Sequence, residues 1–148
     1  MASVLLLSLL APAQAASAHE EVLPTTRSKY GGILPDAYYD ALGTCETGLP
    51  GTRRPNWKHS TKSYTGGLGI ARGTAWNWSG HRDLAKFPAE KQVEIADRIA
   101  FRSWINKDGR KVWRVGPWGW GCLKMKKHIQ AFICASKHEL VKPWRRGC

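Results

Sequence analysis

The sequence predicts an α+β fold, mostly α, in which several helices accompany one short, irregular β segment. The chain has 148 residues, enough for one domain with a modest core. Hydrophobic residues make up 43% of it and charged residues 23%, which is typical of a globular protein. Apolar side chains recur at helical spacing in three segments, and the first of these is followed by a stretch rich in Gly, Pro, Ser and Thr.

Residues 1–18 are predicted to be a signal peptide. They carry no charge, and an apolar run from Val4 to Leu10 is followed by small residues up to Ala15 or Ala18. The positively charged residues that usually precede the apolar run of a signal peptide are missing. The apolar run is too short for a membrane span, so we expect a secreted protein, extracellular or associated with the cell wall. Residues 19–34, polar and containing Pro24 and two glycines, are interpreted as a lead-in linker.

The first helix is expected to begin at Pro35, because proline suits the first helical turn. Gly48 and Pro50 should end it, which places Glu46 in its last turn. Its predicted apolar face consists of Tyr38, Ala41, Leu42 and Cys45. Short strands or a hairpin-like loop are predicted around Tyr64 to Ile70, and a short helix over 73–78, broken by Ser79 and Gly80.

The strongest helical pattern covers residues 88–105, with Pro88 near its start and Glu90 in the first turn. Trp104 lies on its apolar face and is interpreted as a core residue. Residues 110–122 are expected to be a loop rich in Trp and Gly. A last helix is predicted over roughly 123–137, with four inward side chains: Met125, Ile129, Phe132 and Ile133. Residues 123–148 are therefore interpreted as a basic, helical C-terminal extension.

The chain contains four cysteines, and an even number in a small secreted protein predicts disulfide bonds. Spacing alone leaves all three pairings open. Neither a CxxC nor an HExxH motif occurs, so no metal site and no cofactor are predicted. The net charge of +12 favours polyanionic partners. Outside a cell these are anionic wall polymers and membrane surfaces, and nucleic acid is not expected.

Glu46 is the candidate catalytic residue. The negative end of the helix dipole should raise the pKa of its carboxyl group, and packing by Cys45, Trp57 or Trp76 would raise it further through desolvation. A protonated glutamic acid is what a general acid needs in order to protonate a glycosidic oxygen. The alternative is an exposed glutamate at a helix end, without a chemical role.

Six short motifs occur in an order that resembles the catalytic domain of resuscitation-promoting factors, also called transglycosylase-like. The motifs are 42–48 (LGTCETG), Asn56-Trp57, 64–69 (YTGGLG), 74–76 (TAW), 90–99 (EKQVEIADRI) and 118–122 (WGWGC). The similarity covers roughly residues 36–122, so residues 35–122 are interpreted as a catalytic domain.

The resemblance implies a compact lysozyme-like fold that cleaves the β-1,4 bond between N-acetylmuramic acid and N-acetylglucosamine in the glycan strands of peptidoglycan. It also implies that Glu46 is the single catalytic glutamate and that Cys45 pairs with Cys122, which leaves Cys134 to pair with Cys148. The chain departs from the family where Gly69 replaces a glutamine, in the loop 49–55, and in residues 123–148, which have no counterpart. These departures are typical of a divergent branch from actinobacteria or their phages, and they leave the sugar contacts open.

Most glycosidases use two carboxylates, and a second one is not evident here. Asp40 does not share the helical face of Glu46, and most downstream acids, Asp97 among them, are interpreted as solvated residues of the long helix. A single acid suits a lytic transglycosylase, in which the muramic 6-hydroxyl attacks C1. Hydrolysis by water, as in a muramidase, remains the alternative.

Six residues are candidate sugar contacts, of which Trp57 and Trp76 could equally be core residues: Trp57, His59, Tyr64, Gly67, Thr74 and Trp76. Trp113, Trp118 and Trp120 are interpreted as structural, fastening the loop near Cys122. A rival hypothesis is a non-catalytic, cationic secreted protein that binds the cell wall or a membrane.

Overall fold

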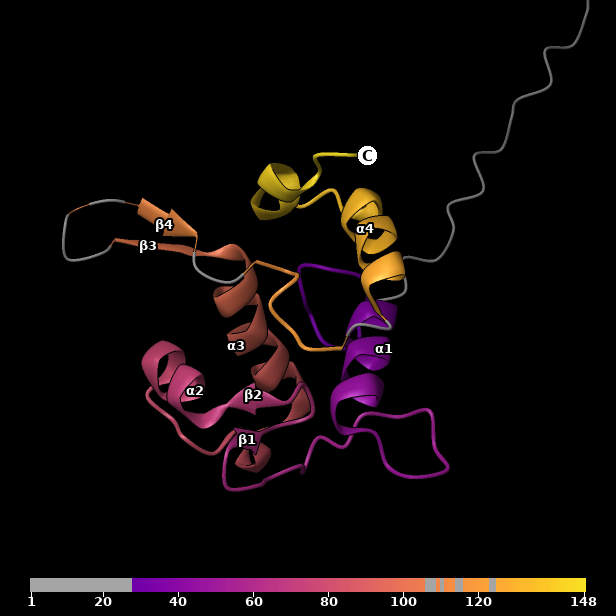
Figure 1. Ribbon diagram of the computed structural model, residues 1–148, viewed down its shortest axis with the longest axis vertical. Helices are drawn as coiled ribbons and strands as arrows, with labels where there is room; N and C mark the ends of the chain where they lie inside the picture. The colour runs from indigo at the N-terminus through magenta and orange to yellow at the C-terminus, as the bar shows by residue number, and fades with distance from the viewer. Residues whose placement is uncertain (1–27, 106–108, 110, 114–115, 123–124) are drawn as a thin grey trace, which may run out of the picture.

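The computed structural model describes residues 28–105, 109, 111–113, 116–122 and 125–148 (Figure 1). Within these residues helices predominate, and the strands form two small antiparallel pairs, so the chain is a mixed, mostly helical α+β protein, as predicted. The predicted signal peptide lies outside the described residues, as do residues 19–27 of the lead-in. No helix in the described part of the chain has the length and hydrophobicity to cross a membrane.

Helix α1 (Asp36–Thr47) begins directly after Pro35, and Glu46 lies in its last turn, as predicted. The carboxylate of Asp36 accepts the backbone N–H of Lys29 at 2.6 Å and that of Tyr30 at 3.2 Å, which fixes the end of the lead-in to the start of the helix. At the other end, the N–H of Gly48 donates to the carbonyl of Thr44 before the chain turns away.

The predicted hairpin and short helix are both present. Strands β1 (Tyr64–Thr65) and β2 (Ile70–Ala71) pair with Thr65 opposite Ile70. The turn between them contains two glycines with left-handed backbone, Gly66 and Gly69. Helix α2 (Arg72–Ser79) follows directly and ends at Gly80, which has a φ of 72°. A single 3-10 turn, η1 (Leu84–Lys86), leads to the long helix.

Helix α3 (Ala89–Phe101) begins where predicted but ends four residues early. Residues Ser103–Ile105 form strand β3, which pairs with β4 (Lys111–Trp113), so the predictions of helix to 105 and of loop from 110 are wrong in these segments. Trp104 consequently lies in a strand and not on a helix face. Both strands contain a β-branched residue and a tryptophan, and the pairing of the two strands outweighs the local helical spacing. The hairpin projects away from the helices (Figure 1).

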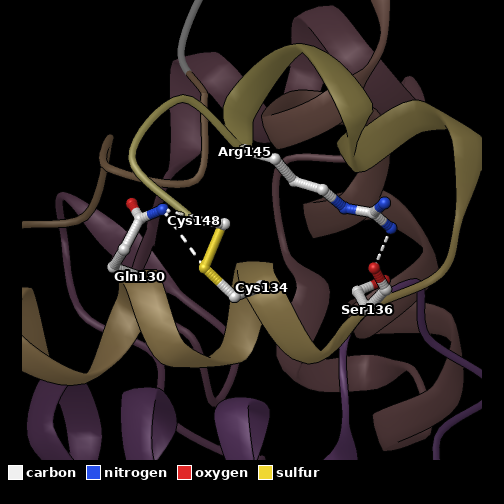
Figure 2. The surroundings of a disulfide bond; sticks show 5 residues. All are labelled: Gln130, Cys134, Ser136, Arg145 and Cys148. Atoms are coloured by element: carbon white, nitrogen blue, oxygen red, sulfur yellow. Dashed lines mark hydrogen bonds between the residues drawn. A yellow bond between two sulfur atoms is a disulfide. The ribbon is translucent and has the colours of Figure 1, made fainter.

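The last helix, α4 (Lys126–Ala135), is shorter than predicted and is followed by a 3-10 helix, η3 (Glu139–Trp144), that the sequence did not indicate. Its inward face is as predicted, with Ile129 and Ile133 buried and Phe132 partly buried. A disulfide between Cys134 and Cys148 returns the C-terminus to α4, and Gln130 lies beside its two sulfur atoms (Figure 2).

One hydrophobic cluster joins the helices, the β1–β2 hairpin, the end of the lead-in and the C-terminal extension. Tyr30 and Leu34 of the lead-in are each 3% exposed, and Val141 of η3 is fully buried. Ile33 connects these parts: its N–H donates to Asp97 of α3 at 2.8 Å, and its carbonyl accepts the hydroxyl of Ser136 at 3.1 Å. Residues 125–148 therefore share the core of the preceding domain.

Candidate active site

The carboxyl group of Glu46 lies between two backbone segments that are distant in sequence. Its Oε1 accepts the N–H of Cys122 at 2.8 Å. On another side lies Gly69, with a φ of 61°, where an added Cβ would be 3.2 Å from the Cβ of Glu46 and 3.4 Å from its Oε2. A left-handed glycine thus allows the turn of the first hairpin to approach the carboxyl group closely.

A cleft of about 330 Å³ opens at Glu46, which is within the range of small-ligand sites. Its lining comes from the end of α1, the β1–β2 hairpin, α2, α3 and the segment 119–121. The lining residues are Glu46, Tyr64, Gly69, Ile70, Ala71, Thr74, Ile99, Gly119, Trp120 and Gly121. Among the described residues of this lining, Glu46 is the only acid. The cleft therefore combines an apolar surface with a few polar groups: one carboxyl, two hydroxyls and the backbone of a glycine-rich segment.

Partial burial raises the pKa of the Glu46 carboxyl group above its ordinary value, and the hydrogen bond from Cys122 opposes this shift. The direction agrees with the sequence-based expectation, but neither Trp57 nor Trp76 lines the cleft. A carboxyl group that holds its proton to higher pH, at the wall of a cleft, has the properties of a general acid.

Three contacts hold the segment 116–122 against the rest of the site. The disulfide between Cys45 and Cys122 joins the residue before Glu46 to the end of this segment, which confirms the implied pairing. The indole N–H of Trp120 donates to the carbonyl of Leu68 at 2.8 Å. The hydroxyl of Tyr38 donates to the carbonyl of Pro117 at 3.2 Å. In Figure 1 the segment runs between α1 and α3.

Of the six predicted sugar contacts, the structure brings Tyr64 and Thr74 to the cleft with Glu46. Tyr64 is 52% exposed, so much of its ring is accessible.

The other four lie elsewhere. Trp57 packs against the core, with its ring 5.1 Å from that of Tyr30. Gly67 is buried beneath Trp57, and its N–H donates to the Gln92 side chain at 2.8 Å. His59 belongs to the irregular segment before β1, and its carbonyl accepts the N–H of Gly66. Trp76 lies on α2, 49% exposed, with the guanidinium of Arg82 over its ring.

The sequence did not indicate several lining residues, among them Ile70, Ile99 and Trp120. Ile70 and Ile99 are ordinary apolar residues in their own segments, and only tertiary packing brings them together. Trp120 offered a usable signal, because it precedes by two positions the cysteine that the resemblance paired with Cys45. The interpretation of Trp120 as structural agrees with its hydrogen bond to the carbonyl of Leu68. It did not anticipate that Trp120 also lines the cleft.

The prediction that Asp97 is a solvated residue of the long helix is wrong. Asp97 lies on α3 and is only 6% exposed. It accepts the Tyr39 hydroxyl at 2.6 Å as well as the N–H of Ile33. Burial raises the pKa of Asp97 to about 6, although both hydrogen bonds lower it. Asp40 of α1 accepts the Tyr30 hydroxyl at 2.5 Å, and neither of these acids lines the cleft.

Within the described residues, no group of three His, Cys, Asp or Glu side chains is arranged to hold a metal ion. Comparison with protein-family models gives no match for this chain. No curated protein and no solved structure matches it either.

Proposed function

We propose that this chain is a secreted enzyme that cleaves the glycan strands of peptidoglycan at the β-1,4 bond between N-acetylmuramic acid and N-acetylglucosamine. Glu46 acts as its general acid, in a lytic transglycosylase or a muramidase. The observation that carries the proposal is a half-buried glutamic acid with a raised pKa at the wall of a 330 Å³ cleft. The sequence resemblance to transglycosylase-like domains supplies the substrate class.

In this mechanism the protonated Glu46 gives its proton to the glycosidic oxygen as the bond to C1 breaks. The resulting carboxylate then takes a proton from the attacking hydroxyl, either the muramic 6-hydroxyl or water. Tyr64 and Thr74, which line the same cleft, would contact the sugar in this mechanism. Among the described lining residues Glu46 is the single acid, and a single acid suits attack by the 6-hydroxyl, in which the same carboxyl group serves first as acid and then as base. Since the protonated form is active, the rate should fall as pH rises through the raised pKa of Glu46.

The Glu46→Gln variant tests the proposal. Its amide oxygen can still accept the Cys122 N–H, so the fold and binding to the wall should persist. Clearing of purified peptidoglycan should fall by about 10²–10⁴-fold, the usual contribution of a general acid. The matched control is Glu90→Gln, an exposed acid at the start of α3, which should leave clearing unchanged. Undiminished clearing by Glu46→Gln would exclude Glu46 as the acid.

Mass spectrometry of the released fragments separates the two reactions. Transglycosylation leaves 1,6-anhydro ends and hydrolysis leaves reducing ends, which differ by one water molecule.

A second candidate function is non-catalytic binding to anionic wall polymers or a membrane surface. Its support is the net charge of +12 and the C-terminal extension, where Lys126, Lys137, Lys142 and Arg146 are exposed. Charge reversal at these four positions would then abolish binding to the wall, and Glu46→Gln would have no effect on any activity.

A further inference from the structure

A tight turn at residues 116–119 begins the segment that forms part of the cleft. The N–H of Gly119 donates to the carbonyl of Gly116 at 3.2 Å, which closes the turn. Gly116 and Pro117 are both buried. The Trp144 ring lies directly on Gly116, where an added Cβ would be 2.7 Å from it, and the Tyr38 hydroxyl donates to the carbonyl of Pro117. The inner side of this turn is therefore held on two sides by the core.

Trp118 is the third residue of the turn and is 38% exposed. Four tryptophans with described side chains pack against the core, and Trp118 is not one of them: they are Trp57, Trp78, Trp120 and Trp144. No ring contact, cation–π contact or side-chain hydrogen bond involves Trp118 within the described part of the chain. The interpretation of Trp118 as a structural fastener is therefore not supported.

Trp118 does not itself line the cleft, but it directly precedes residues that do. The next three residues, Gly119, Trp120 and Gly121, all line it, and adjacent Cα atoms are only about 3.8 Å apart. The lining already includes one accessible aromatic ring, that of Tyr64 from β1. Trp118 thus carries a second exposed ring, on a turn that the core holds in place and that leads directly into the lining.

We propose that Trp118 is a stacking platform for a pyranose ring of the glycan, at a subsite beyond the sugars that meet Glu46. The inference rests on the proposed function and adds to it a preference for longer strands. The C–H face of a pyranose is apolar and fits the flat surface of an indole. Because the turn is already ordered, little conformational entropy is lost when a sugar binds to the ring.

The test measures binding by isothermal titration calorimetry to the full chain carrying Glu46→Gln, which prevents turnover. The probes are peptide-free glycan fragments of peptidoglycan, a disaccharide and a hexasaccharide. Adding Trp118→Ala should weaken hexasaccharide binding roughly ten-fold and leave disaccharide binding unchanged. Trp118→Tyr should retain most of the affinity. The matched control is Trp76→Ala, which removes an exposed tryptophan of α2 whose two chain neighbours do not line the cleft, and it should change neither affinity.

Hexasaccharide binding that is indifferent to Trp118→Ala would overturn this inference and leave the proposed function intact. An equal loss for both fragments would also overturn it, because it would indicate general damage to the cleft. If neither fragment binds to any of the variants, including the one that retains Trp118, the proposed function fails together with the inference. Thermal unfolding of each variant confirms that the compared proteins are folded.

Discussion

At the scale of single residues, the environment of Glu46 depends on two backbone groups and not on other charged side chains. The N–H of Cys122 holds one carboxyl oxygen, and Gly69 lets the hairpin turn approach the other. Two features of position 69 require a glycine. The left-handed backbone there favours glycine, and a side chain would start in contact with Glu46.

Asp97 is the other notable acid, and it connects three parts of the chain. It lies on α3, accepts the Tyr39 hydroxyl of α1 and accepts the Ile33 N–H of the lead-in. Because burial raises its pKa to about 6, the folded protein holds this proton at a pH where the unfolded chain has released it. Stability should therefore fall as pH rises through this interval.

We expect the Asp97→Asn variant to remove this pH dependence. Between about pH 4 and pH 6 the wild-type protein should lose about 3 kcal/mol relative to the variant, and above pH 6 the difference should be constant. Urea unfolding of both proteins at several pH values measures this difference. Parallel stability curves from pH 4 to pH 7 would show that Asp97 titrates normally in the folded state.

At the scale of elements, the C-terminal 3-10 helix η3 supports the segment 116–122. Trp144 of η3 covers Gly116, the left-handed residue at which the tight turn begins. The far end of the same segment is joined to α1 by the disulfide of Cys45 and Cys122. The C-terminal extension therefore helps to position the part of the chain that lines the cleft.

We expect Trp144→Ala to loosen this segment. Because the indole is partly buried, the change should lower the free energy of unfolding by about 2–3 kcal/mol and reduce peptidoglycan clearing. Lys142→Ala, at an exposed position of the same 3-10 helix, is the matched control and should be neutral. Urea unfolding and a clearing assay on both variants check the prediction. Reduced stability with full clearing would mean that η3 does not position the cleft.

At the scale of the whole molecule, two disulfides close loops of very different length. Cys45 and Cys122 are separated by 77 positions and enclose most of the domain, whereas Cys134 and Cys148 are separated by 14. A longer closed loop restricts the unfolded chain more strongly, so the two bonds should differ in their effect on stability.

Replacing both cysteines of each pair by serine should lower the free energy of unfolding by about 4.5 kcal/mol for Cys45 and Cys122, and by about 3 kcal/mol for Cys134 and Cys148. Each double variant should be compared with the wild-type protein by urea unfolding under non-reducing conditions. The reverse order would indicate that interactions in the folded state, and not restriction of the unfolded chain, dominate the contribution of these bonds.

Local signals were sufficient for much of the fold. The proline and glycine flanking α1 and the turn glycines of the first hairpin act over a few residues, so these elements formed where predicted. The apolar spacing of α4 predicted its inward face, although the helix is shorter than expected. The β3–β4 pairing, in contrast, overrode a helical pattern at 102–105. The residues of the cleft also divide into two groups. Glu46 and Tyr64 were named as candidates from the sequence, whereas Ile70 and Ile99 were not.

The sequence by itself determined that a glutamate ends the first helix, that the chain is mostly helical and strongly cationic, and that its cysteines are even in number. Each of these properties resides in residue type or in spacing within one segment. Only the tertiary structure decided that Glu46 is half buried beside Cys122 and Gly69, that Asp97 is enclosed, and that Trp118 remains exposed. Burial and pKa depend on which distant segments pack together, and that packing is a property of the whole chain.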